Sequence, residues 1–171
     1  MFDQPVRHHR PVPDMTYEQM LQAVQYEGAY PDTDRAAASV HRVLAALGRR
    51  LTGPERVDLA ARLPVEAALT FTAQIPDCAR LTGWGFVKDL ATRAGVSPAT
   101  ARWDTGAVLA VVARLAGPDL LARILKSLPS GYALLFGQID LTAGRPTRSE
   151  QGRPDCRGIP DPHGAPLHAG R

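Results

Sequence analysis

The fold is decided by the stretch LTGPERVDLAARLP at residues 51–64, which recurs as LAGPDLLARILKSLP at residues 115–129. Each copy has the signals of a helix end, a Gly-Pro turn, a short amphipathic helix and a Leu-Pro pair that opens the next helix. Proline fits the first turn of a helix and breaks its interior, so each Gly-Pro predicts a helix start. The recurrence therefore indicates an architectural unit used twice rather than a loop with a function of its own.

The similarity extends beyond this stretch in both directions. Downstream, LPVEAALTF at residues 63–71 agrees with LPSGYALLF at residues 128–136 at five of nine positions. Upstream, each copy follows a long segment whose apolar residues recur with helical period, which predicts a helix over about 33–50 and another of about 18 residues after Pro98. The residues predicted to face the core are Ala36, Val40, Val43, Leu44 and Leu47 in the first long helix and Ala101, Thr105, Val108, Leu109 and Val112 in the second.

Shorter helices precede and follow the long ones. Thr16 with Gln19 three residues later has the capping-box pattern of a helix start. Gly95 predicts the end of the corresponding helix in the second half, and Ser97 followed by Pro98 predicts the next N-cap. The further residues predicted to line the core are Met20, Leu21, Val24, Val57, Leu59, Ala60, Leu63, Ala68, Leu69, Phe71, Phe86, Val87, Leu90, Leu120, Leu121, Ile124 and Leu125.

The predicted fold class is all-α, with two tandem repeats of about four helices each packed into one helical body. The last 30 residues contain 5 Pro and 5 Gly and almost no large apolar side chains, a composition typical of disordered segments. The predicted organisation is a disordered N-terminal segment at 1–14, repeat 1 at 15–75, a joint at 76–83, repeat 2 at 84–141 and a disordered tail at 142–171.

Composition excludes several classes of protein. The net charge is only +3, and 5 Arg against 3 acidic residues in the last 30 positions supply most of it, so charge alone does not indicate a nucleic-acid-binding surface. No apolar stretch reaches 18 residues, and the N-terminus has no signal-peptide pattern, so we expect no membrane association. The two cysteines, Cys78 and Cys156, form no CxxC motif, which favours reduced thiols and a cytoplasmic location.

Several of these segments resemble a bacterial family catalogued as domain of unknown function 2267. The resemblance covers about residues 16–138 and is carried by the short first helix at 17–24, by VLAALGRRLTGPE at 43–55, by DLAARLP at 58–64 and by LPSGYALLF at 128–136. These motifs concern packing and capping. The resemblance thus implies an all-α fold, no established activity and no catalytic residues.

Residues for catalysis or metal binding are sparse. Cys78 with His41 is a weak candidate for a nucleophile and a base, because nothing nearby in the sequence would stabilise a thiolate. A metal would have to use the terminal residues His8, His9, Cys156, His163 and His168, which lack ligand spacing. We therefore expect no enzyme, no cofactor and no metal.

The stretch VKDLATRAGVSPATARW at residues 87–103 resembles the helix-turn-helix of LacI-type repressors. Gly95 would turn the chain, and a second helix would present its first turns to a DNA groove. The residues that would contact DNA are Lys88, Ser97, Thr100 and Arg102. Asp104 would meet phosphate badly, and the second helix is long and apolar. These observations favour a corner of the packing unit, with DNA binding as the alternative function.

Trp103 is the most informative single residue. It lies two positions after Ala101, about 200° around the helix from the apolar stripe. Trp103 is therefore predicted either to contact the other half or to form a partner surface, with Arg102 and Arg114 beside it. The favoured function is a non-catalytic protein-interaction or regulatory module, and the oligomeric state stays open.

Overall fold

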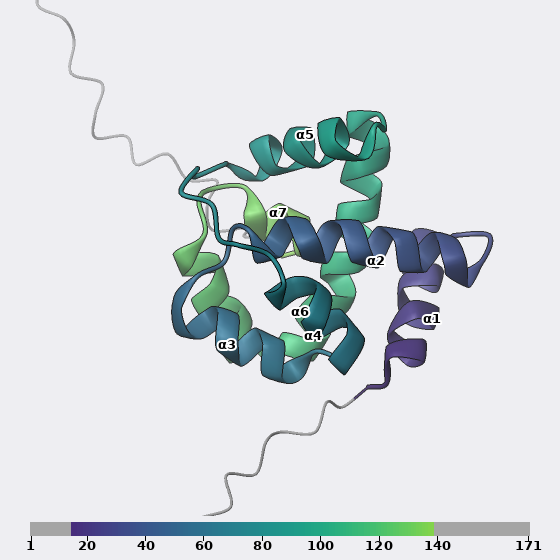
Figure 1. The fold of residues 1–171 in the computed structure, drawn as a ribbon, viewed down its shortest axis with the longest axis horizontal. Helices are drawn as coiled ribbons and strands as arrows, with labels where there is room; N and C mark the ends of the chain where they lie inside the picture. Colours follow the sequence, from purple (N-terminus) through teal and green to yellow (C-terminus); the bar gives the residue numbers. More distant parts are fainter. Residues whose placement is uncertain (1–14, 139–171) are drawn as a thin grey trace, which may run out of the picture. The chain divides into compact units, whose positions relative to one another are not determined.

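The computed structural model describes residues 15–138, and in this part of the chain every regular element is a helix (Figure 1). The helices are α1 (Tyr17–Gly28), α2 (Thr33–Gly48), α3 (Gly53–Arg62), α4 (Val65–Thr72), α5 (Gly83–Ala94), α6 (Pro98–Ser127) and α7 (Tyr132–Leu135). The predicted all-α class is confirmed. Helix α6 is interrupted at Gly117, whose φ of 73° and ψ of 167° are not helical. Pro118 follows, so the two segments 98–116 and 118–127 meet at an angle.

Side-chain caps confirm the predicted starts of α1, α2 and α6. Thr16 and Gln19 form both hydrogen bonds of a capping box at α1. The Asp32 carboxylate accepts from the backbone N–H of Arg35 at 2.8 Å and caps α2, while Ser97 caps α6 in the same way. Gly95 has a positive φ of 63° and closes α5, as its position in the sequence predicts. Local signals therefore place most helix boundaries.

A single hydrophobic core includes residues of all seven helices. Helix α2 packs against α1, α4, α5 and α6, and helix α6 packs against α1, α2, α3, α5 and α7 (Figure 1). These two long helices thus bring the predicted halves into one body. No helix within residues 15–138 is long and apolar enough to cross a membrane.

Two residues predicted to line the core are instead exposed. Val57 is 67% exposed and Leu69 is 64% exposed. On α4 the buried residues are Ala67 and Phe71, four positions apart, and Leu69 lies halfway between them. A position two residues from a buried one is about 200° around the helix, so α4 turns Leu69 to the outside. The same spacing separates Val57 from the buried Leu59 on α3.

The predicted division into two repeats and a joint stays a prediction. Helices α1 to α4 lie within the predicted repeat 1, and α5 begins at Gly83, the last residue of the predicted joint. The segments predicted to be disordered, 1–14 and 142–171, lie outside the described residues.

The C-terminal ends of α2 and α4 meet at Arg56 on α3. Its guanidinium donates to the carbonyl groups of Gly48, Thr72 and Gln74, the last at 2.7 Å. A cation near the ends of two helices satisfies carbonyls that have no partner within the helix and opposes the negative ends of the two dipoles. Helices α2 and α4 approach so closely here that a Cβ on Gly48 would lie 2.2 Å from the carbonyl oxygen of Phe71.

This close approach predicts the effect of adding one methyl group. Gly48→Ala should lower the free energy of unfolding by about 1–3 kcal/mol, because the new Cβ overpacks a backbone contact that cannot move cheaply. Gly106→Ala on α6 is the matched control. Its Cβ would meet only Arg102 Nη1 at 3.7 Å, so the gain in helix propensity should raise stability by about 0.5–1 kcal/mol. Urea denaturation of both variants measures the difference, and equal stabilities would contradict the close packing.

Candidate functional site

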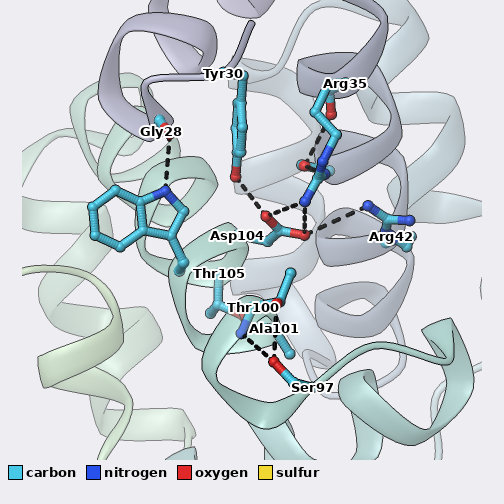
Figure 2. Close-up of polar contacts among 11 residues, drawn as sticks. Gly28, Tyr30, Arg35, Arg42, Ser97, Thr100, Ala101, Asp104 and Thr105 are labelled. Atoms are coloured by element: carbon cyan, nitrogen blue, oxygen red, sulfur yellow. Dashed lines mark hydrogen bonds and ion pairs between the residues drawn. The ribbon is translucent and has the colours of Figure 1, made fainter.

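The carboxylate of Asp104, on α6, is buried among polar partners from the first half of the chain (Figure 2). Its side chain is 3% exposed. The Arg35 guanidinium donates to both carboxylate oxygens, at 2.9 and 3.0 Å. The Tyr30 hydroxyl donates to Oδ1 at 2.7 Å, and Arg42 approaches Oδ2 at 3.5 Å. A buried carboxylate needs this degree of pairing, since leaving water is costly for a charge.

The partners of Asp104 are themselves held in place. The Arg35 guanidinium lies 4.8 Å from the centroid of the Tyr30 ring and also donates to the buried hydroxyl of Ser39. Burial raises the pKa of Tyr30 to about 12. The Tyr30 hydroxyl therefore stays protonated at neutral pH and acts as a donor to Asp104. We refer to Asp104, Arg35, Arg42 and Tyr30 as the Asp104 cluster.

Trp103 lies next to Asp104 in the chain and connects α6 to the end of α1. Its indole Nε1 donates to the carbonyl oxygen of Gly28 at 2.9 Å. A Cβ on Gly28 would lie 2.3 Å from the Tyr30 ring, so glycine at this position lets Tyr30 reach Asp104. Trp103 thus contacts the first half of the chain through its N–H, while 59% of the residue remains exposed. The predicted contact with the other half is present, and a partner surface at the exposed ring stays a prediction.

A surface pocket of about 420 Å³ lies beside the exposed indole ring, and we refer to it as the Trp103 pocket. Its wall is formed by Glu27, Ala99, Arg102, Trp103, Gly106 and Ala107. The small residues on α6 leave the space open. Arg102 is exposed and forms no ion pair with any residue in 15–138. Arg114, the third residue predicted for a partner surface, pairs with Glu27 at 2.6 Å. The fold therefore gathers Trp103, Arg102 and Arg114 around one surface region.

The residues predicted to contact DNA lie on α5 and on the first turns of α6. Lys88 and Arg102 are exposed. The Ser97 hydroxyl accepts from the backbone N–H of Thr100 at 3.1 Å and lies 2.9 Å from the Thr100 hydroxyl, so both side chains take part in capping. Asp104, expected to repel phosphate, is buried and paired with arginine instead. The prediction that Asp104 would meet phosphate is wrong, because periodicity does not reveal a partner on another helix.

Cys78 and His41 show no catalytic arrangement. Cys78 is exposed and lies between α4 and α5. It lines a second pocket, whose lining does not include His41 on α2. Within residues 15–138 no group of three or more potential metal ligands occurs. The histidines His8, His9, His163 and His168 and the second cysteine, Cys156, lie outside the described residues.

A comparison with models of protein families matches the helical part of the chain. The profile of a family described as "Uncharacterized conserved protein (DUF2267)" matches residues 17–135, from the start of α1 to the end of α7. The chain belongs to the DUF2267 family. A search of curated proteins finds no match to it. The predicted family is confirmed, and the description carries no activity.

The Asp104 cluster of this DUF2267 protein was not identified from its sequence. Its members come from α6, from α2 and from the connection before α2, and they are separated by up to 74 residues along the chain. One signal could have found it: Asp104 lies between the buried positions Ala101 and Thr105 on a helix whose periodicity is otherwise apolar. An acidic residue on a buried face requires cationic or donor partners. Arg35 and Arg42 lie seven residues apart on one face of α2, which fits that requirement.

Removing the carboxylate should cost more than removing the indole N–H. Asp104→Ala leaves Arg35, Arg42 and Tyr30 without their shared acceptor and should lower the free energy of unfolding by about 3 kcal/mol. Trp103→Phe removes one hydrogen bond to Gly28 and should cost about 1 kcal/mol. Urea denaturation of the two variants provides the test. A smaller loss for Asp104→Ala than for Trp103→Phe would show that the Asp104 cluster does not hold α6 in place.

The raised pKa of Tyr30 predicts a stability change at high pH. Tyr30 has a folded-state pKa of about 12, above its ordinary value of 10.0. Its contribution to stability is therefore fully present below about pH 10 and is lost as the pH rises toward 12. The free energy of unfolding should fall in this window, and less steeply in Tyr30→Phe. Denaturation curves at a series of pH values measure both slopes, and parallel curves for the two proteins would contradict the prediction.

Proposed function

We propose that this chain is a non-catalytic protein-interaction module whose partner docks at the Trp103 pocket. The observation that carries the proposal is an exposed indole ring, anchored through its N–H, beside a pocket and an arginine, Arg102, that forms no ion pair within residues 15–138. Tryptophan and arginine are among the residue types enriched in the side chains that dominate binding energy.

The anchoring supports this function in a second way. The hydrogen bond to Gly28 restrains the Trp103 side chain before any partner arrives. A side chain that is already ordered loses less conformational entropy on binding. The apolar part of the pocket wall, from Ala99 and Ala107, suits a partner's apolar side chain, while Arg102 suits a carboxylate next to it.

Three variants test where the partner docks. Arg102→Glu reverses the charge beside the pocket, and Gly106→Met fills the pocket from α6 while leaving the Trp103 anchor intact. Lys88→Glu is the matched control, with the same charge change on the exposed face of α5. The tagged full-length proteins are cross-linked in their native host, and the captured proteins are identified by mass spectrometry. A partner should be captured by the wild type and by Lys88→Glu and be lost with the other two variants.

Measurements on the same variants can also overturn the proposal. Each variant should be at least as thermally stable as the wild type, measured by circular dichroism, so that loss of capture is not loss of folding. Capture of the same proteins by Gly106→Met as by the wild type would exclude the Trp103 pocket as the docking site.

DNA binding is the second candidate, and the corner between α5 and α6 favours it. Gly95 and Ser97 adopt the turn and cap geometry that a helix-turn-helix requires, and Lys88 on α5 and Arg102 on α6 are exposed. Against it, the segment 98–116 packs along the core, so only its first turns are free to enter a groove.

Fluorescence anisotropy with labelled duplex DNA tests this candidate. Binding through phosphate contacts should weaken steeply as salt rises, with a slope on logarithmic axes of about 0.9 per contact. Lys88→Glu and Arg102→Glu should both reduce affinity and salt dependence, whereas Gly106→Met should leave them unchanged. Absence of binding to duplex at low salt would eliminate this function.

A further inference from the structure

A second pocket, of about 340 Å³, lies at the connection between α4 and α5, and we refer to it as the joint pocket. The connection from Pro76 to Leu81 forms one part of its wall. Arg50, after the end of α2, and Tyr132, at the start of α7, form other parts. The joint pocket is separate from the Trp103 pocket, since the two have no lining residue in common.

Two residues that line the joint pocket each carry a buried hydrogen-bonding group with no partner within residues 15–138. These groups are the hydroxyl of Tyr132 and the Nε of Arg50. Tyr132 is 1% exposed, and the Arg50 side chain is 4% exposed. Burial raises the pKa of Tyr132 to about 12, so its hydroxyl is a donor at neutral pH. A buried donor without a partner costs free energy, and an acceptor that enters the pocket would remove that cost.

Positive charge exceeds negative charge around these groups. The terminal nitrogens of Arg50 are occupied by Asp77 at 3.3 Å and by Asp89 at 3.2 Å. Asp89 is also paired with Arg93 at 3.0 Å. Arg49 interacts electrostatically with all four of these residues, and burial together with the Arg93 charge lowers the pKa of Arg49.

Arg80 adds a further cation to this group. It is exposed, lines the joint pocket and forms no ion pair within the described residues. This region thus contains four arginines, at positions 49, 50, 80 and 93, and two aspartates, at positions 77 and 89. The resulting excess of two positive charges would be reduced by a bound anion.

We propose that the joint pocket binds a small molecule through an oxyanion, a phosphate or carboxylate group, received by Tyr132, Arg50 and Arg80. The Tyr132 hydroxyl and Arg50 Nε donate to its oxygens, and Arg80 at the pocket wall supplies a cation that no acidic side chain in 15–138 occupies. Arginine is suited to both groups because its planar donors match their oxygens. The volume of the pocket admits a compact ligand, at the small end of ordinary ligand sites.

The thiol of Cys78 provides a probe for this site, because it is exposed and lines the same pocket. The rate at which iodoacetamide alkylates Cys78 in the native full-length protein is measured by mass spectrometry of its peptide. Cys156 in the same sample is the internal control. Sodium phosphate, sodium succinate and sodium chloride are compared at equal pH and ionic strength. At a concentration ten times its Kd, phosphate or succinate should slow Cys78 alkylation about tenfold relative to chloride, without affecting Cys156.

Substitutions locate the effect in the joint pocket. Tyr132→Phe keeps the ring and removes the donor, and Arg80→Gln removes the exposed cation. Both should reduce the protection of Cys78, expressed within each variant as the ratio of the chloride rate to the phosphate or succinate rate. Arg102→Gln, the same charge change at the Trp103 pocket, should not reduce it. Because Arg80 is exposed, Arg80→Gln remains a test even if Tyr132→Phe disturbs folding.

The outcomes separate the two classes of ligand. Protection by phosphate alone assigns the site to phosphorylated molecules, protection by succinate alone assigns it to carboxylates, and protection by both leaves the shared oxyanion as the recognised group. Equal alkylation rates of Cys78 in all three salts would overturn the proposal, as would protection that persists unchanged in Arg80→Gln.

Discussion

The buried carboxylate of Asp104 is the constraint on which the arrangement of α1, α2 and α6 depends. Apolar side chains packed between helices tolerate small shifts along the helix axes, because hydrophobic burial is not directional. A carboxylate that accepts from Arg35 and Tyr30 at fixed distances tolerates none without leaving a charge unpaired. The Asp104 cluster therefore selects one register among those that the apolar faces allow.

The exposed surface follows from the same register. Because Trp103 precedes Asp104 by one residue, burial of the carboxylate turns the indole ring about 100° away, toward the outside. There its N–H meets the carbonyl oxygen of Gly28 at the end of α1. The residue proposed to anchor a partner is thus oriented by the residue that fixes the helix, which gives a physical reason for an exposed tryptophan next to a buried acid.

The two polar regions of this DUF2267 protein differ in how fully their groups are paired. In the Asp104 cluster every carboxylate oxygen and the Tyr30 hydroxyl have partners. In the joint pocket the Tyr132 hydroxyl and Arg50 Nε have none within the described residues, and arginines outnumber aspartates. A fully paired cluster stabilises the fold, whereas unpaired donors beside a pocket are the arrangement that a ligand can complete.

The sequence by itself determined the all-α class, the capped helix starts and most of the core, because these depend on near neighbours and on helical periodicity. Helical periodicity also places Trp103 away from the apolar stripe of its helix, which marks this residue as unusual. The errors at Val57 and Leu69 arose on short helices, where too few turns define a face. Only the tertiary structure decided that Asp104 is buried beside Arg35, and that Arg50 and Tyr132 share a pocket. These residues are far apart in the chain, and no local pattern records which helix will bring a partner to them.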